Sequence, residues 1–497
     1  MTIPMLLGRD DRIECNDFPF VAGMMMNPSS FFRYGMVTAA ATCLVVLPLN
    51  LTGCSDSDEP HQLNVGEEEN ANQGDDTDAG VNVGGSDDIG APSGSDDTGN
   101  DDPNQGNDDP NQGNDDPNQG NDDPNQGNDD PNQGNDDPNQ QPGGSSTTQT
   151  LVDEQLELTA GYTDTVEFEV PDNVYSVAIS VTEGPPSNQY LITDWQGPNG
   201  FQLVPDGWES TEAVCYQNCP NRVMASPGAF GGLAPNNPDS QVEPGTHQFR
   251  VGTQSGMGFL YDPSMAQSNN NVRVTVHAEI VDGSTDQGTI DLNLFFTGAN
   301  GWTASTAPDD PILSNIIAEV DTLYDQVGID IGEIAYHDAD ESYQVIEDLM
   351  SGTGDLAQLL SKSSRTELEG PSVFFVNELR MGGFGFQGGA VLGISGGIPG
   401  PMIVNGSPRS GVAVATDSSQ ATGAPGIAHV TAHELGHYLG LFHTSEQFAM
   451  PGTPGHDPLP DTPEDDPGYL MHATGGGDTM SEWQGRVMRK NPWVYFD

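Results

Sequence analysis

The stretch HELGHYLGLFH, residues 433–443, decides how this chain can be interpreted. His433 and His437 are four residues apart, so on a helix both imidazoles lie on one face and can hold one metal ion between them. Gly440 can take a positive φ that ends the helix and turns the chain back, which brings His443 towards the same ion. Three protein ligands leave one coordination position for water, as in a catalytic zinc site.

Glu434 follows the first of these histidines directly. Its carboxylate can reach a water on the metal without being a ligand, which suits a general base. Three histidines and a glutamate at these offsets have no packing reason to occur together, since histidine is mostly a surface or site residue. We therefore predict one catalytic Zn²⁺ held by His433, His437 and His443, with Glu434 as the catalytic base.

The pattern H-E-x-x-H-x-x-G-x-x-H resembles that of the metzincin metalloproteases. The resemblance implies a mixed twisted sheet packed on a zinc-binding helix, peptide-bond hydrolysis, and a methionine in a tight turn beneath the zinc. Met471, 28 residues after His443, is the best candidate for that methionine, and Met450 and Met480 fit less well. The Asp-Thr-Pro segment at 461–463 is similar to the pappalysin and cytophagalysin branch of the clan.

The whole chain is strongly acidic. It has 497 residues, a formal charge of −62, and 13 Lys and Arg against 75 Asp and Glu. Such a charge repels the phosphates of nucleic acids, so we expect no nucleic-acid partner. The acidic run at 457–467 can hold structural Ca²⁺ or be a solvated loop, and its residue types do not decide between these.

Residues 1–53 have the features of a signal peptide. Arg33 precedes a mostly apolar run from Met36 to Leu51, which is too short and too interrupted for a membrane span. The sequence LTGC that ends at Cys54 resembles a bacterial lipobox, and cleavage before Cys54 leaves its thiol to carry lipid. We expect a membrane partner through this lipid, with a plain secretory signal as the alternative. The expected location is the cell envelope, at the outer membrane or cell surface, or outside the cell.

Residues 54–150 are expected to be a disordered acidic linker. They contain 25 Asp and Glu and no Lys or Arg, and DDPNQ occurs six times between Asp101 and Gln140. These repeats hold no hydrophobic residue to offset the entropy cost of ordering, and their like charges extend the chain. We predict a tether. A calcium-binding repeat is the alternative, although the pattern lacks the features of calcium β-rolls.

Residues 151–282 are predicted to form an all-β sandwich. Alternating apolar and polar residues, separated by Pro and Gly turns, indicate half-buried strands. Four such runs are 166–170, 176–181, 248–251 and 271–280. The sequence identifies no catalytic residues in the sandwich. Its role stays open: it can bind substrate, guard the cleft before activation, or only space the enzyme from its tether.

Cys215 and Cys219 stand four residues apart within the predicted sandwich. In an exported chain they can close a small disulfide loop. Two free buried thiols are one alternative. A thiolate that caps the zinc in a latent form, as in some relatives of the resembled clan, is another.

Residues 289–497 are predicted to be the metzincin-like catalytic domain, which makes the fold class α+β. Strands are expected at 289–296, 329–336, 372–376 and 412–414, and helices at 311–327, 355–360, from 425 through the zinc ligands, and 479–491. The glycine-rich stretch 382–411 is expected to line an edge strand, where an extended peptide can pair through its backbone. His429 is expected to be structural rather than a ligand.

Taken with the resemblance, these features predict an exported, membrane-tethered zinc metalloendopeptidase that acts on a protein or peptide substrate. In that reaction the zinc polarises the scissile carbonyl, and Glu434 takes a proton from water and delivers it to the leaving amine. One alternative is a non-catalytic surface-binding lipoprotein with a structural zinc site, and another is a zinc hydrolase for a non-peptide amide. The intact Glu434 argues against the first, because structural sites usually fill the fourth position with a protein ligand.

Overall fold

The computed structural model describes residues 44–48, 144–210, 214–215, 219–255, 270–380, 389–417, 424–445 and 455–497. Cys54, the acidic linker up to residue 143, and Met450 lie outside these residues, as do the signal-peptide residues apart from 44–48. The described residues all belong to one compact unit.

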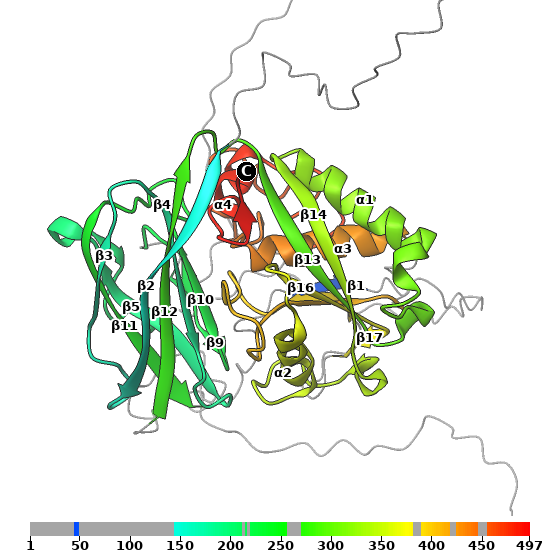
Figure 1. The fold of residues 1–497 in the computed structure, drawn as a ribbon, viewed down its shortest axis with the longest axis horizontal. Helices are drawn as coiled ribbons and strands as arrows, with labels where there is room; N and C mark the ends of the chain where they lie inside the picture. Colours follow the sequence, from blue (N-terminus) through cyan, green and yellow to red (C-terminus); the bar gives the residue numbers. More distant parts are fainter. Residues whose placement is uncertain are drawn as a thin grey trace, which may run out of the picture. The chain divides into compact units, whose positions relative to one another are not determined.

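The first part of this unit consists of antiparallel sheets (Figure 1). One sheet has the order β10-β4-β12-β2, with β2 at Ser145–Leu158, β4 at Val174–Thr182, β10 at Phe230–Ala234 and β12 at Asn270–Asp282. The other has the order β3-β11-β5-β6, with β3 at Val166–Val170, β5 at Asn188–Gln196, β6 at Gln202–Val204, β9 (Ser226–Pro227, paired with β5) and β11 at Gly245–Ser255. A small pair, β7 at Val214–Cys215 and β8 at Val223–Met224, lies beside them.

The apolar residues of both sheets form one core, as the predicted alternation requires. In β3, Val166, Phe168 and Val170 are buried whereas the two glutamates between them are exposed. Side chains from β4, β5 and β11 complete this core. The period-two pattern therefore places one face of each strand against the other sheet.

Strand β2 begins earlier than the sequence analysis expected. Residues 145–150 were assigned to the linker, yet they pair with β12, from Ser145 opposite Asp282 to Thr150 opposite His277. Their side chains are mostly exposed, so they lack the apolar pattern that marks a strand. Main-chain hydrogen bonds to the long partner strand hold them, and those bonds do not depend on side-chain type. The strand is also fixed to the chain end, because the Ser146 amide donates to the Phe496 carbonyl at 3.0 Å.

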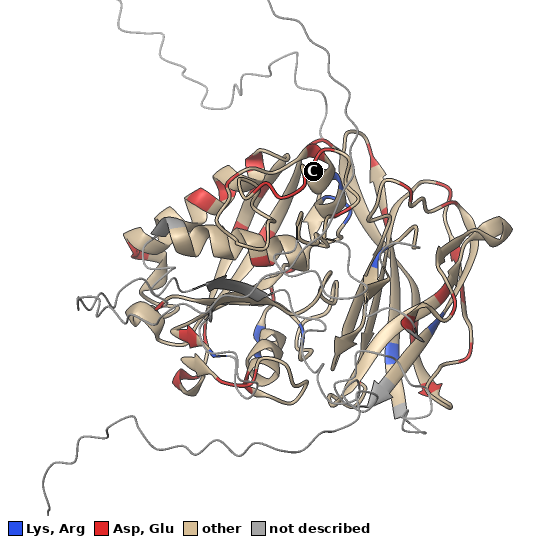
Figure 2. Cartoon of the chain, turned by 180° about the vertical axis from the view of Figure 1, so that it is seen from behind, with Lys and Arg blue, Asp and Glu red and all other residues tan. Residues whose placement is uncertain are grey.

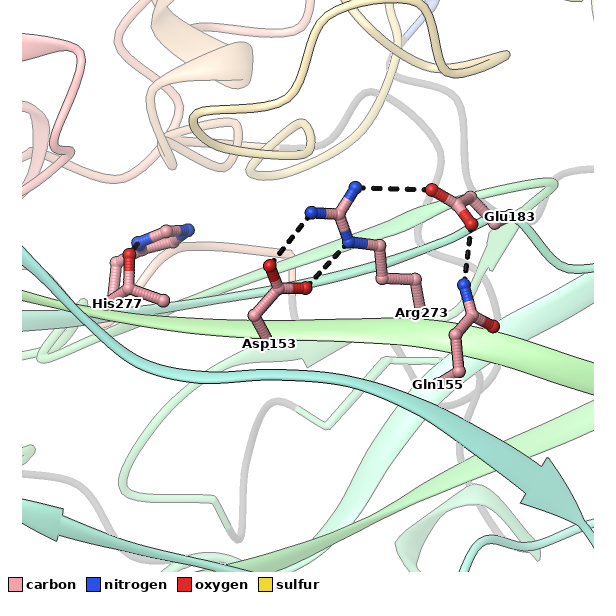
Figure 3. A network of polar contacts seen from close by, with 6 residues as sticks. Asp153, Gln155, Glu183, Arg273 and His277 are labelled. Carbon is pink, nitrogen blue, oxygen red and sulfur yellow. Dashed lines mark hydrogen bonds and ion pairs between the residues drawn. The ribbon is translucent and has the colours of Figure 1, made fainter.

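A polar network on β12, β2 and the end of β4 lies at the sandwich surface (Figure 3). Arg273 pairs with Asp153 at 2.7 Å and with Glu183 at 3.2 Å, and Gln155 donates to Glu183 at 2.6 Å. The three charged side chains are 42–52% exposed, so water screens the pairs and each contributes little to stability. The network links the neighbouring strands β2 and β12 to the residue after β4.

The second part is built on a mixed sheet whose order is β14-β13-β16-β19-β18-β17-β15. Its strands are β13 (Gly288–Phe296), β14 (Ile329–Asp338), β15 (Val345–Ile346), β16 (Ser372–Val376), β17 (Glu378–Leu379), β18 (Gly389–Ser395) and β19 (Val412–Ala415). β20 (Val494–Tyr495) pairs with β13, and β1 (Leu44–Pro48) pairs with β18. The central strands are parallel, and β18 runs antiparallel to β19.

Helices cover both faces of this sheet (Figure 1). Apolar residues on one face pack against α1 (Pro311–Asp325) and α3 (Ala424–Tyr438), and those on the other face pack against α2 (Asp355–Leu360). The α+β class predicted from the sequence is therefore present. Burial on both faces explains the uninterrupted apolar run in β16.

The last helix, α4 (Glu482–Met488), begins with the predicted capping box between Ser481 and Gln484. It is shorter than the expected 479–491 because Arg489 ends its helical hydrogen bonding and Pro492 follows. None of the described helices combines the length and apolar character that a membrane span requires. Acidic residues are spread over the helices and loops, with few basic ones between them (Figure 2).

Candidate metal centre

Helix α3 and the turn after it bring the three histidines of the motif together. The helix ends at Tyr438, and Gly440 has a φ of +116°, a left-handed conformation that favours glycine. The amide of Leu441 donates to the carbonyl of Gly436 at 2.9 Å, which closes the turn. The chain then runs back along the helix to His443, as the spacing of the motif predicts.

The ring nitrogens of the three histidines converge on one point. Nε2 of His433 lies 3.0 Å from Nε2 of His437 and 3.3 Å from Nε2 of His443. A tetrahedral zinc with Zn–N bonds of about 2.05 Å separates its nitrogen ligands by about 3.3 Å, so these distances fit. Within the part of the chain that the structure describes, no other group of three His, Cys, Asp or Glu side chains converges in this way.

The second ring nitrogens fix the orientation of two of these imidazoles. Nδ1 of His433 lies 2.6 Å from the Leu470 carbonyl, and Nδ1 of His437 lies 2.6 Å from the Leu441 carbonyl. A carbonyl can only accept, so each Nδ1 carries the proton and each Nε2 keeps its lone pair. Lone pairs that face one another without a proton repel, and a cation between them removes that repulsion. This donor set therefore fits a metal ion.

Burial keeps the imidazoles of His433 and His437 neutral. All three are at most 4% exposed. Burial, with the neighbouring His443, lowers the pKa of His433 to about 3, and burial likewise lowers the pKa of His437 well below its ordinary value. Neutral imidazole is the form that binds metal, so these two ligands need no deprotonation near pH 7.

Glu434 lies fully buried on α3 beneath strand β18. A Cβ added at Gly393 of β18 would lie 2.5 Å from Cγ and 2.8 Å from Oε1 of Glu434. Only glycine therefore allows the strand to pass so close to the carboxylate. Burial raises the pKa of the Glu434 carboxyl well above its ordinary value, and the backbone of Ser395 opposes this in part.

Met471 lies fully buried against α3 at the level of Gly436. A Cβ added at Gly436 would lie 2.7 Å from the Met471 sulfur, and the Met471 carbonyl accepts from the amide of Thr444 at 2.8 Å. The turn that contains Met471 thus supports both the helix and the segment after His443. Met480 belongs to the same core, but its amide bonds Gln326, away from the histidines.

Other candidate residues from the sequence do not join the cluster. Cys215 and Cys219 form a disulfide, so neither offers a thiolate to cap a metal. His429 is not part of the converging group. The acidic run at 457–467 contributes no convergent group of three carboxylates among the described residues.

Two glycines have site roles that the sequence analysis did not assign. Gly393 admits Glu434 beneath β18, and Gly436 admits Met471 beneath α3. The role of Gly436 could have been predicted, because a glycine inside a helical pattern costs stability and often marks a close contact with another segment. Gly393 lies in a glycine-rich stretch, where no single position stands out.

Fold and site together define an α+β protein with a three-histidine centre that can bind a metal ion. No family model and no curated protein matches the chain. Among solved structures it is similar to metalloproteinase-II from Bacteroides fragilis, with 13% identity and a TM-score of 0.27, over 42% of this chain and 54% of that chain. It is also similar to a chain in a structure of a chaperone-substrate complex, with 14% identity and a TM-score of 0.25, over 42% of this chain and 36% of that chain. This chain thus spans about half of the first of those chains and about a third of the second. At TM-scores this low, neither similarity indicates a function for this chain.

Proposed function

We propose that this chain is a zinc-dependent endopeptidase. The observation that carries the proposal is the convergence of the Nε2 atoms of His433, His437 and His443, together with a buried carboxyl, that of Glu434, directly after His433 on the same helix. A bound zinc would supply Lewis acidity towards a carbonyl oxygen and would lower the pKa of water beside it. His433, His437 and His443 would hold the ion.

In the proposed reaction Glu434 moves the proton. Its elevated pKa without metal shows that the surroundings tolerate the neutral acid, so the carboxyl can accept a proton and keep it until the leaving amine forms. The near absence of water at this position also strengthens each electrostatic interaction. Gly393 lets strand β18 lie directly against the carboxyl, because a side chain at this position would collide with Glu434.

A peptide substrate is supported by the pairing at β18. The segment Leu44–Pro48 lies antiparallel to this strand, with Leu44 opposite Ile394 and Val46 opposite Val391. An extended segment of polypeptide thus fits along β18, and Gly393 of that strand contacts Glu434. Strand β18 is not the edge strand that the glycine-rich stretch predicted, because β19 and β17 flank it and Leu44–Pro48 also pairs with it. We propose that a substrate peptide takes the place of Leu44–Pro48 along β18 and pairs through its backbone.

The replacement Glu434→Gln tests the assignment. It should lower peptide cleavage by about 10²–10⁴-fold, as expected for loss of a general base, while zinc remains bound one per chain because the three histidines are intact. Glu482→Gln on the exposed face of α4 is the control and should cleave like the wild type. Zinc content by atomic spectroscopy and cleavage of an unfolded protein, with and without a chelator, give both readouts.

Two outcomes contradict this proposal. Full cleavage by Glu434→Gln would remove the role of the carboxylate. A wild-type chain that binds zinc and cleaves no peptide would favour the structural-zinc alternative.

A further inference from the structure

A buried polar cluster in the sandwich part lies against the loop that carries the third histidine. We call Asn221, Arg222, Asn236 and Ser240 the Arg222 cluster, and each is at most 5% exposed. Oδ1 of Asn236 accepts from the Arg222 amide at 2.8 Å, and Nδ2 of Asn236 donates to the Arg222 carbonyl at 2.7 Å. Oδ1 of Asn221 accepts from the Asn236 amide at 3.1 Å and from the Ser240 hydroxyl at 2.8 Å. These bonds give the cluster one fixed arrangement.

The guanidinium of Arg222 extends from this cluster over the ring of Phe442. Its carbon lies 4.6 Å from the ring centroid, and Nη2 also donates to the Asn236 carbonyl at 3.0 Å. The same ring packs with Val214 and Met224, which also belong to the sandwich part. Phe442 is the residue before His443, so the sandwich contacts the chain directly beside the third ligand.

The residue after His443 is held from the other side. The Thr444 amide donates to the Met471 carbonyl at 2.8 Å, and the Thr444 carbonyl accepts from the Asp457 amide at 3.1 Å. His433 and His437 lie on a regular helix, whereas His443 lies in a segment without regular structure. The contacts of its two neighbours in the chain therefore help to fix its position, together with its own contacts with His433 and His437.

Close main-chain contacts and buried hydrogen bonds also join the two parts. A Cβ added at Gly231 of β10 would lie 2.2 Å from the Gly400 carbonyl oxygen, and the Ser180 hydroxyl bonds both the amide and the carbonyl of Met402 at 2.9 and 3.0 Å. Buried polar bonds with this geometry leave little freedom for sliding. The Arg222 cluster is thus fixed relative to the zinc helix.

We propose that Arg222 is a positioning residue for His443: the sandwich holds the ring of Phe442 and thereby sets the third metal ligand. This gives the sandwich a role that its own sequence did not indicate. The inference rests on the metal-binding half of the proposed function and is independent of peptide cleavage.

The test uses the full chain and measures metal binding rather than activity. The variants are Arg222→Ala, Arg222→Lys, Phe442→Leu and the double variant Arg222→Ala with Phe442→Leu. The control is Arg250→Ala, because the Arg250 guanidinium covers the ring of Tyr162 at 4.3 Å in the same sandwich, but not beside the histidines. Zinc affinity is measured by chelator competition, and the visible spectrum of the Co²⁺-loaded protein reports the ligand geometry.

We expect Arg222→Ala to weaken zinc binding by about 10–100-fold, the range found when groups that orient ligands are lost, and to change the Co²⁺ spectrum. Arg222→Lys should fall between this variant and the wild type, since an ammonium keeps the charge but lacks the flat face of the guanidinium. Arg250→Ala should stay within twofold of the wild type. The double variant should bind zinc no more weakly than the weaker-binding single variant, because both substitutions break the same contact between Arg222 and Phe442.

Unchanged zinc affinity and an unchanged Co²⁺ spectrum in Arg222→Ala, even with a lower melting temperature, would overturn the proposal and leave a packing role. Should Arg222→Ala fail to fold, Arg222→Lys and Phe442→Leu decide by the same criteria. A wild-type chain that binds no zinc would overturn this inference and the proposed function together. A wild-type chain that binds zinc and cleaves no peptide would overturn the proposed function alone.

Discussion

Glu434 is a residue whose burial lowers the stability of the metal-free fold. Its carboxyl is fully buried, and burial raises its pKa well above the ordinary value near 4.5. Without a metal ion the folded protein favours the neutral acid, whereas the unfolded chain ionises freely above that value. The metal-free fold therefore loses stability as the pH rises through this range, and a bound cation would offset the loss.

We predict that Glu434→Gln stabilises the metal-free protein by an amount that grows with pH. Glutamine does not ionise, so it avoids the cost that the wild type meets above pH 4.5. The difference in free energy of unfolding should be smallest at pH 4.5 and increase towards pH 8, with a slope of at most about 1.4 kcal/mol per pH unit. Urea unfolding in the presence of a chelator measures it, and a difference that is constant with pH would contradict the argument.

At the scale of the element, α3 combines a favourable helix pattern with one unfavourable residue. Gly436 lowers helix stability, yet the sulfur of Met471 occupies the space where a Cβ would lie. The contact places the turn with Met471 against the helix between the two ligands His433 and His437. At position 436 the close contact with Met471 thus outweighs the helix propensity that a residue larger than glycine would add.

The replacement Gly436→Ala tests which effect is larger. Alanine gains about 1 kcal/mol of helix propensity, but the added methyl displaces the buried Met471 at a cost of about 1–3 kcal/mol. We expect a net lower melting temperature and weaker zinc binding. Thr322→Ala, at an exposed position of α1, gains helix propensity with no buried neighbour to displace and loses only the exposed bond of its hydroxyl to the Ala318 carbonyl at 2.8 Å, so it should raise the melting temperature. A gain in stability for Gly436→Ala equal to that of Thr322→Ala would show that Met471 yields freely.

The elements that the sequence predicted best are those with strong local patterns. The bounds of α2 and β16 agree with the expected 355–360 and 372–376, and α3 begins one residue before the expected start. The convergence of the three histidines also follows from helix spacing and one glycine. The start of β2 and the contact of Arg222 with Phe442 were not predictable, because both depend on partners that are far away in the sequence.

At the scale of the whole molecule, the two folded parts form one structural unit. Polar bonds, close main-chain contacts and the Arg222 cluster join them. The lipid tether at Cys54 and the export of the chain stay predictions, and they concern residues outside the described part. The cell-envelope location stays a prediction as well.

We predict that Cys54→Ala releases the protein from the membrane fraction of an expressing bacterium. The thiol of Cys54 is the proposed site of lipid attachment, so its loss removes the anchor and leaves the folded part intact. Metabolic labelling with palmitate should mark the wild type and not the variant. An unlabelled wild-type chain, recovered in the medium, would favour the plain secretory signal.

The hydrogen bond between Ser146 and Phe496 places the first strand of the folded part beside the carboxyl end of the chain. Adjacent ends of this kind are the geometric condition for circular permutation. In a chain shortened to residues 144–497, a short Gly/Ser bridge could join the two ends, and new ends could be opened in an exposed loop. The site would then be held by the same packing while the order of the segments along the gene is changed.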